Sequence, residues 1–281
     1  MQNTPQQYAF LVGSAKSGTT KLADLLDLHP EIGVSSDKEP DTFARNDVSA
    51  AVMAEYDTLF EPNSTIRIDA STSYSEGTDS LQIAKRLAEV DPNAKILYLV
   101  RDPAKRAWSS YWHYVRNGTE KREPMAAITN QTSPHFVGSC FNLHVANYVS
   151  VFGRDNVRVI QFEDFIKQAD DIYQQIITFL GLENVTLEQD ESTKTKNKSY
   201  QWRGPAAFLK HVNPKYIQKT TKVLKSLLPE SALEKLRNSA TKPVPDLNDT
   251  DYATLAALFE ADHQSLQQDY ADLFIKPTSS K

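Results

Sequence analysis

Residues 8–20 have the sequence YAFLVGSAKSGTT, and this stretch decides the fold. Tyr8 to Gly13 is a short apolar run that ends in glycine, and leucines follow at helical spacing over residues 22–26. The pattern predicts a strand, a small polar loop and a helix. In that arrangement the loop N–H groups and the helix N-terminus face one point, which favours an anion such as phosphate. The stretch therefore predicts a phosphate-binding loop over residues 13–20.

The loop differs from the P-loop of nucleoside triphosphatases in the place of its lysine. In the pattern G-x-x-x-x-G-K-[ST], the lysine follows the second glycine and reaches the β- and γ-phosphates. Here Thr19 follows Gly18, and the lysine lies earlier, at Lys16. A nucleoside triphosphate kinase would lose its phosphate clamp by this change. A purely structural turn is the other alternative, because glycine-rich turns commonly join strands to helices.

Two later apolar runs continue the alternation of strands and helices. Lys95 to Val100 is rich in β-forming residues and leads into Arg101-Asp102-Pro103, where the proline suits the first turn of a helix. Val157 to Phe162 predicts another strand, and the amphipathic helix after it ends at Gly181. Strands that alternate with helices form parallel βαβ units. The sequence therefore predicts an α/β fold with a central parallel sheet flanked by helices.

Two of these segments resemble the signatures of one family. Residues 15–20, AKSGTT, resemble the 5′-phosphosulfate loop of the sulfotransferases that use 3′-phosphoadenosine 5′-phosphosulfate (PAPS). Residues 96–103, ILYLVRDP, are similar to the strand-to-helix segment whose arginine and serine hold the 3′-phosphate, and Arg106, Ala107, Ser109 and Tyr111 continue this likeness. The stretches EDF (163–165) and FLGL (179–182) extend it, so the resemblance covers Tyr8 to Leu182.

The resemblance implies a P-loop-like sulfotransferase fold with a helical C-terminal layer, and it implies which residues bind PAPS. Arg101 and Ser109 would hold the 3′-phosphate, and the 5′-phosphosulfate would lie on Lys16, Ser17, Gly18, Thr19 and Thr20. The chemistry of the residues agrees, because the leaving phosphate gains negative charge and Lys16 with the loop amides supplies positive donors. The planar guanidinium of an arginine such as Arg101 can also bind a phosphate through two parallel hydrogen bonds. This scheme requires no metal.

Transfer to a hydroxyl needs a base that takes its proton. Glu39 is the candidate, because Glu39-Pro40 with Phe43 resembles the Glu-Pro-x-x-Phe segment that supplies the catalytic glutamate in carbohydrate sulfotransferases of the glucosaminoglycan-modifying kind. His113 and His144 are the rivals, since histidine is the base in small-molecule sulfotransferases of similar fold.

A third segment, residues 69–74, gives information on the identity of the acceptor. Residues 69–74, DASTSY, resemble the Glu-Lys-Thr-Pro-x-Tyr stretch that the glycan enzymes place beside the acceptor. Here Ala70 replaces the lysine and Thr72 replaces the proline. The segment therefore supplies no second catalytic lysine and does not specify a glucosaminoglycan as the acceptor.

After residue 183 the sequence predicts helices at 206–228 and 252–270. The second helix has Asp249 or Thr250 as its predicted N-cap, and its apolar face comprises Leu255, Leu258, Phe259 and Leu266. We interpret these helices as a layer on the sheet within one domain of residues 1–281. Relatives close basic residues over the nucleotide from this region, which makes Lys196, Lys198 and Arg203 candidates for the 3′-phosphate, with Arg203 favoured for its bidentate geometry.

The amino-acid composition limits the kinds of partner and the cellular location that we expect. The 281 residues carry a net charge of −5 with a pI near 5.7, whereas a protein that neutralises nucleic-acid phosphates is usually basic. We therefore expect no nucleic-acid partner. Cys140 is the only cysteine, which excludes an intrachain disulfide and fits the cytoplasmic location that we expect. The first residues lack a signal-peptide pattern, and no apolar run of about 18 residues predicts a transmembrane segment.

We therefore predict a PAPS-dependent sulfotransferase that acts on a hydroxyl or amine of a carbohydrate, a glycoconjugate or a small molecule. Glu39 would be the base, and Lys16 would assist the leaving phosphate. Two alternatives stay open at this stage: a P-loop nucleotide-dependent phosphotransferase, and a non-catalytic protein that binds PAPS or its product. The sequence does not specify the oligomeric state.

Overall fold

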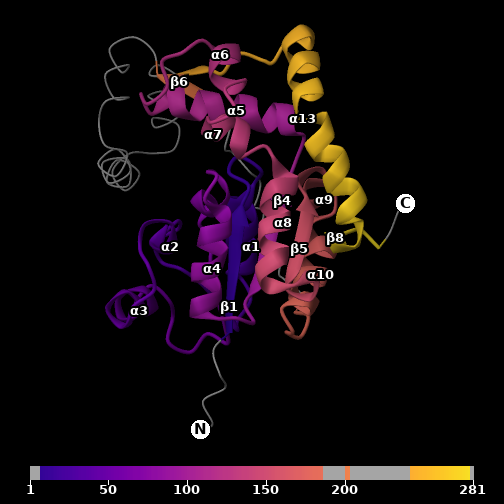
Figure 1. The fold of residues 1–281 in the computed structure, drawn as a ribbon. Helices are drawn as coiled ribbons and strands as arrows, with labels where there is room; N and C mark the ends of the chain where they lie inside the picture. The colour runs from indigo at the N-terminus through magenta and orange to yellow at the C-terminus, as the bar shows by residue number, and fades with distance from the viewer. Residues whose placement is uncertain (1–6, 186–199, 203–240, 279–281) are drawn as a thin grey trace, which may run out of the picture.

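The computed structural model describes residues 7–185, 200–202 and 241–278 (Figure 1). Its centre is a six-stranded sheet in the order β2-β3-β1-β4-β5-β8, in which all neighbouring strands run parallel. The strands are β1 (Gln7–Gly13), β2 (Ile32–Val34), β3 (Ile66–Asp69), β4 (Lys95–Val100), β5 (Val157–Gln161) and β8 (Phe274–Ile275). This arrangement confirms the predicted α/β fold.

Three of the six strands match the apolar runs of the sequence, namely β1, β4 and β5. The third run is one residue shorter than predicted, because Phe162 begins the next helix. The sequence did not predict β2, β3 and β8, which have 3, 4 and 2 residues. Strands of this length are too short to show a period of their own.

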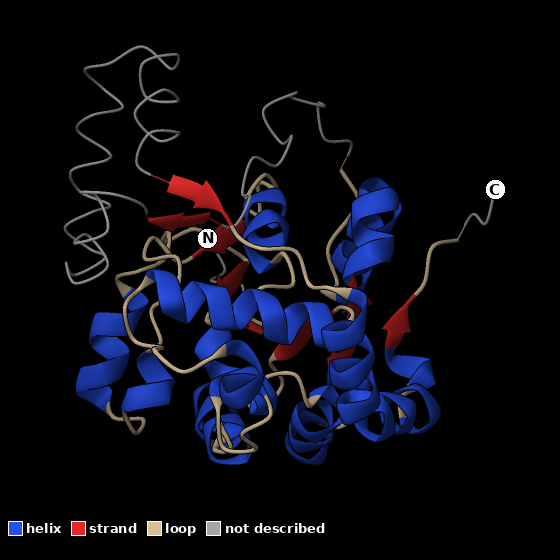
Figure 2. Ribbon diagram, turned by 90° about the horizontal axis from the view of Figure 1, so that it is seen from above, coloured by secondary structure: helices blue, strands red, loops and turns tan. Residues whose placement is uncertain are grey.

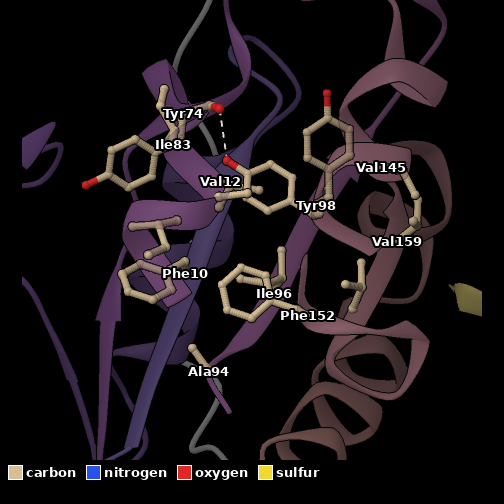
Figure 3. Close-up of a cluster of buried hydrophobic side chains, with 14 of the residues drawn as sticks. Phe10, Val12, Tyr74, Ile83, Ala94, Ile96, Tyr98, Val145, Phe152 and Val159 are labelled. Carbon is tan, nitrogen blue, oxygen red and sulfur yellow. Dashed lines mark hydrogen bonds between the residues drawn. The ribbon is translucent and has the colours of Figure 1, made fainter. Parts of the chain in front are cut away.

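Helices cover both faces of the sheet (Figure 2). Phe10 and Val12 of β1 lie in the cluster on one face, and Ala9 and Leu11 lie in the cluster on the other. The first face is covered by α4 (Ser80–Val90) and α8 (Phe141–Phe152), and the second by α1 (Thr19–Leu26), α9 (Phe162–Lys167) and α10 (Ala169–Phe179). Figure 3 shows the first cluster, where side chains of β1 and β4 face those of α8. Because both faces are buried, β1 and β4 contain no charged or amide side chain after their first residues, Gln7 and Lys95.

The strand order has a topological switch point at the boundary between β1 and β4. After β1 the chain continues to β2 and β3 on one side of β1, whereas β4 and β5 lie on the other side. Ligands of open α/β sheets bind at such a switch point, outside the carboxyl ends of the strands. Residues 14–18 and residues 101–102 follow these two strands. The topology therefore brings the two sequence signatures to one place.

Helices also lie beyond the carboxyl ends of the strands, at the top of Figure 1. They are α5 (Pro103–Arg116), α6 (Pro124–Ile128) and α7 (Pro134–Val137), next to an antiparallel pair formed by β6 (Tyr200–Trp202) and β7 (Thr241–Pro243). The smaller elements are α2 (Thr42–Arg45), α3 (Ala50–Asp57), η1 (Thr72–Ser75), η2 (Arg154–Asn156) and η5 (Ala271–Leu273). In the part of the chain that the structure describes, no helix is both long enough and apolar enough to span a membrane.

The last helix, α13 (Asp249–Asp269), corresponds to the predicted helix at 252–270 and packs on α5 and α8. Leu255, Phe259 and Leu266 are buried, as its apolar face predicts. The predicted N-cap was wrong. Asn248 caps the helix, because its Oδ1 accepts a hydrogen bond from the N–H of Asp251 at 2.9 Å. The predicted helix at 206–228 lies outside the described residues.

The N-cap of α13 is testable by substitution. We expect Asn248→Ala to lower the free energy of unfolding by about 1 kcal/mol, because an N–H of the first turn loses its acceptor. Thr250→Ala is the matched control, since Thr250 is exposed and caps nothing, and its cost should stay within about 0.5 kcal/mol. Urea denaturation measures both values. A larger loss for Thr250→Ala would contradict the assignment.

Candidate functional site

The loop between β1 and α1 has the backbone shape of an anion site. Lys16 and Gly18 adopt left-handed φ angles of 74° and 90°. Gly18 is the N-cap of α1, and no side chain caps this helix, so the N–H groups of its first turn keep their capacity for a ligand. A Cβ on Gly18 would lie 2.7 Å from the ring of Phe162, so only glycine fits here. The loop therefore supplies backbone donors beside a lysine.

Two serines shape this loop from within. The Ser14 Oγ donates to the carbonyl of Leu99 at 2.9 Å and lies 2.6 Å from the Ser17 Oγ. The N–H of Ser17 donates to the carbonyl of Ser14 at 3.1 Å, and both serines are buried. The Ser17 hydroxyl and the Ser17 N–H therefore both make their contacts inside the loop. Ser17, predicted to touch the ligand, contributes here to the loop's shape.

Arg106 is fully buried and fastens the loop to the layer above the sheet. Its Nε donates to the carbonyl of Ala15 at 3.0 Å, and its Nη1 donates to the carbonyls of Pro134 at 2.9 Å and His135 at 3.2 Å. Its Nη2 lies 3.8 Å from the Glu76 carboxylate. Arg106 lies within the second sequence motif, but its sequence context predicted no role for it in the site.

Gly138 lies directly against the Arg106 guanidinium. A Cβ added to Gly138 would lie 2.5 to 2.8 Å from three atoms of the Arg106 guanidinium. The φ angle of Gly138 is −68°, which any residue adopts, so backbone conformation does not require glycine here. The space that the guanidinium occupies requires it.

Arg101 reaches the loop directly. Its Nη1 donates to the carbonyl of Lys16 at 2.9 Å, and its guanidinium lies 5.1 Å from the ring centroid of Phe162. Burial lowers the pKa of Arg101, and the nearby Glu163 and Asp102 oppose this shift. The Nε is buried and has no partner among the described residues. Arg101 thus combines a fixed position with unused hydrogen-bonding capacity.

Ser109 lies half-buried on α5, the helix that starts two residues after Arg101. In the described ranges, no hydrogen bond joins its hydroxyl to Arg101 or to the loop. Arg203, Lys196 and Lys198 lie outside the described residues.

Lys16 lies half-buried among other cations. Burial, together with Arg116, Arg106 and Lys38, lowers its pKa to about 8, while Glu39 opposes this shift. A bound anion would stabilise the charged form of a lysine in such surroundings, because it compensates for the lost hydration and for the repulsion from the other cations.

Glu39 lies close enough to Lys16 to affect its pKa. Its Oε2 accepts a hydrogen bond from the Thr72 hydroxyl at 3.1 Å. Its side chain reaches solvent, yet surrounding atoms crowd it, and this partial desolvation raises the pKa of Glu39 against the opposing effects of Lys38 and Thr72. Lys38 links Glu39's loop to the phosphate loop, because its Nζ donates to the Thr20 Oγ1 at 2.5 Å. The structure thus brings Glu39 and Lys16 to one site.

The two candidate histidines differ in their surroundings. His144 is fully buried, with its Nδ1 2.9 Å from the Ser80 hydroxyl and its Nε2 2.9 Å from the Val137 carbonyl, and burial lowers its pKa to about 4. His144 of α8 thus contacts the first residue of α4 and the last residue of α7. His113 lies near Lys16 instead: burial, Lys16 and Arg116 lower its pKa to about 3, and its Nδ1 lies 2.6 Å from the Arg116 Nη2. His113 is therefore the one of the two that lies near Lys16.

Glu76 also lies at the site, although nothing in its sequence context marked it. Burial raises its pKa, while Arg106 and a hydrogen bond from Tyr114 oppose the shift.

Within residues 7–185, 200–202 and 241–278, no group of three or more His, Cys, Asp or Glu side chains is placed to hold a metal ion.

Comparison with curated proteins gives distant relatives of one kind. Carbohydrate sulfotransferase 15 of Homo sapiens is 21% identical over 265 residues, which cover 70% of this chain and 47% of that protein. The bifunctional heparan sulfate N-deacetylase/N-sulfotransferase 1 of Caenorhabditis elegans is 31% identical over 108 residues, which cover 37% of this chain and 12% of that protein. The chain spans less than half the length of these relatives.

Fold and family comparisons agree with each other. A crystal structure of a sulfotransferase from Alicyclobacillus acidocaldarius matches with a TM-score of 0.54 and 25% sequence identity, over 67% of this chain and 87% of that one. The family model described as "Sulfotransferase domain" matches residues 6–231 and so includes the phosphate loop, Glu39, Arg101 and Ser109. The chain therefore belongs to the sulfotransferase domain family.

Proposed function

We propose that this chain, acting as a single sulfotransferase domain, transfers the sulfuryl group of PAPS to a hydroxyl or amine of a carbohydrate or glycoconjugate. The observation that carries the proposal is the uncapped N-terminus of α1 beside Lys16, at the switch point of the sheet. A lysine before the second glycine lies beside one transferring group and lacks the position that clamps a triphosphate. Membership of the sulfotransferase domain family supports the same reaction.

Two separate anion anchors suit the two phosphates of PAPS. The backbone donors of Gly18, Thr19 and Thr20 would take the 5′-phosphosulfate. Arg101, with Ser109 on the following helix, would take the 3′-phosphate, and the buried, unpartnered Nε shows that its donors are not all used. We assign Arg203 to the same phosphate on its place in the sequence alone. We assign no metal to the reaction.

The transfer step assigns different roles to Lys16 and Glu39. The bond between sulfur and the bridging phosphate oxygen breaks, and a bond between sulfur and the acceptor oxygen or nitrogen forms. The electron pair of the broken bond stays on the phosphate, where the Lys16 ammonium stabilises it. The acceptor proton passes to the carboxylate of Glu39, whose pKa is raised from the ordinary glutamate value and therefore lies closer to neutrality.

A carbohydrate acceptor is supported by the names of the curated relatives, which are carbohydrate and heparan sulfate sulfotransferases. A screen with labelled PAPS across glycans, lipids, phenols and amines tests the proposal, with the Lys16→Ala variant as the blank. We expect transfer to at least one glycan. Binding of PAPS without transfer to any class would favour a pure nucleotide-binding protein, and transfer of phosphate from ATP would favour the phosphotransferase.

The two-anchor site predicts a nucleotide preference. We expect 3′-phosphoadenosine 5′-phosphate to stabilise the protein against heat more than AMP or ATP with Mg²⁺, with a gain of about 2.7 kcal/mol at about 100 times its Kd. Arg101→Ala should abolish most of this preference, and Ser109→Ala should reduce it less, since arginine supplies a charged fork. Lys105→Ala is the matched control, because it removes an exposed charge from the same helix. An unchanged preference in Arg101→Ala would refute the assignment of the 3′-phosphate.

Separate substitutions distinguish the two roles at the transfer point. Lys16→Ala should lower kcat by a factor of about 10² to 10³ and weaken product-nucleotide binding much less, because the lysine acts on charge that develops during transfer. Glu39→Gln should lower kcat by about 10² to 10⁴ with unchanged nucleotide affinity. Glu61→Gln, an exposed glutamate outside the site, serves as the control. Full activity in Glu39→Gln, with activity lost in His113→Ala, would instead identify a histidine base.

The lowered pKa of Lys16 predicts a pH dependence. Lys16 is charged below its pKa of about 8 and loses its proton above it, so kcat/KM for PAPS should fall as the pH rises through this value. Arginine stays protonated over this range, so Lys16→Arg should flatten that part of the profile even if its activity is lower. Steady-state rates from pH 6 to pH 10 measure both profiles. A decline of equal shape in both proteins would assign it to another group.

A further inference from the structure

A buried carboxylate lies beneath the loop that carries Glu39. Asp69 is the last residue of β3 and is fully buried. Its Oδ1 accepts hydrogen bonds from the N–H of Ser71 at 3.0 Å and from the Ser71 Oγ at 2.5 Å. Its Oδ2 accepts from the hydroxyls of Tyr74 at 2.8 Å and Tyr56 at 3.0 Å. Burial raises the pKa of Asp69 to about 6, while these four donors oppose the shift.

Two of these hydroxyls continue to the backbone of residues 39–43. The N–H of Asp41 donates to the Ser71 Oγ at 2.9 Å, and the N–H of Phe43 donates to the hydroxyl of Tyr74 at 3.3 Å. Each connection therefore runs from a loop N–H to a hydroxyl and from that hydroxyl to the Asp69 carboxylate. We call these two connections the relays. The hydroxyl of Tyr56 donates to the same carboxylate but accepts no hydrogen bond from the loop.

An ionised carboxylate only accepts hydrogen bonds, and this fixes the direction of both relays. The hydrogens of Ser71 and Tyr74 must point at Asp69, which leaves oxygen lone pairs to accept from Asp41 and Phe43. An asparagine at position 69 would present an NH₂ group to one of these hydroxyls. That hydroxyl would then accept from the amide and lose its alignment with the loop N–H.

The loop needs such support because of its own backbone. Asp41 follows Pro40 and adopts a left-handed φ of 55°, which is uncommon for a residue with a side chain. The Ser73 hydroxyl donates to the Asp41 Oδ1 at 2.5 Å, and the Thr72 hydroxyl holds Glu39 itself. All these hydroxyls belong to the segment that directly follows Asp69.

We propose that Asp69 is a positioning residue for Glu39, which it holds in place through the Ser71 and Tyr74 relays without touching the substrate. This inference rests on the proposed role of Glu39 as the base. A merely structural Asp69 would, when substituted, weaken nucleotide binding and stability together. A positioning Asp69 affects kcat and leaves the nucleotide site intact, because the phosphate loop and Arg101 make no hydrogen bond to the relays.

The first experiment compares two tyrosines on the same carboxylate oxygen. We expect Tyr74→Phe to lower kcat about tenfold, with the KM for PAPS and the affinity for the product nucleotide within about twofold of the original protein. Tyr56→Phe removes a hydroxyl from the same Oδ2 but breaks no relay, so its kcat should stay within about twofold even if its Tm falls as much. Equal losses of kcat in the two variants would overturn the proposal.

The second experiment is a double-mutant cycle of Glu39→Gln and Asp69→Asn. If Asp69 acts through Glu39, Asp69→Asn alone lowers kcat about 10- to 100-fold, but in the Glu39→Gln background it lowers kcat no more than about twofold. Multiplying losses would overturn the positioning role and leave the base assignment intact. Full activity in Glu39→Gln would overturn the base assignment and this inference with it. If Asp69→Asn does not fold, Ser71→Ala replaces it in the cycle with the same expected coupling.

Discussion

The shape of the site depends on the hydrogen bonds of the buried Arg106 guanidinium. Burying a charged group is costly unless hydrogen bonds or an opposite charge compensate it, and Arg106 donates from its Nε and Nη1 to main-chain carbonyls of two separate segments, while its Nη2 lies 3.8 Å from the Glu76 carboxylate. One of these carbonyls belongs to the phosphate loop, and the others belong to α7. The position of the phosphate loop relative to α7 is thus set by a residue of α5.

The electrostatics of the site differ from those of the whole chain. The protein carries a net charge of −5, yet Lys16 lies close enough to Arg106, Arg116 and Lys38 for each of them to lower its pKa. Positive charge is concentrated at the loop after β1, and the carboxylates of Glu39 and Glu76 lie close enough to interact with Lys16. The local field at the loop therefore favours an anion, although the net charge of the chain is negative.

Much of this arrangement could be predicted because it is local in sequence. The runs that became β1 and β4 are apolar on both faces, and the glycine and the lysine of the loop follow directly. The two segments meet at one edge of the sheet because the two strands pair in parallel. What could not be predicted depends on contacts between distant residues: the Thr72 hydroxyl on Glu39, the carbonyls around Arg106 and the separate environments of His113 and His144. The N-cap of α13 was missed because Asn248, Asp249 and Thr250 are all capable caps, and only the backbone distinguishes them.

The contact between Gly138 and Arg106 has a consequence for sequence evolution. Because a single added carbon at position 138 would overlap the guanidinium, the two positions are not free to vary independently. A lineage that shortens the side chain at position 106 gains room for alanine or serine at position 138, whereas the reverse order of substitutions passes through an overcrowded intermediate. Relatives that keep the arginine should therefore keep the glycine, and correlated change at this pair would record which of them retain the same anchor for the loop.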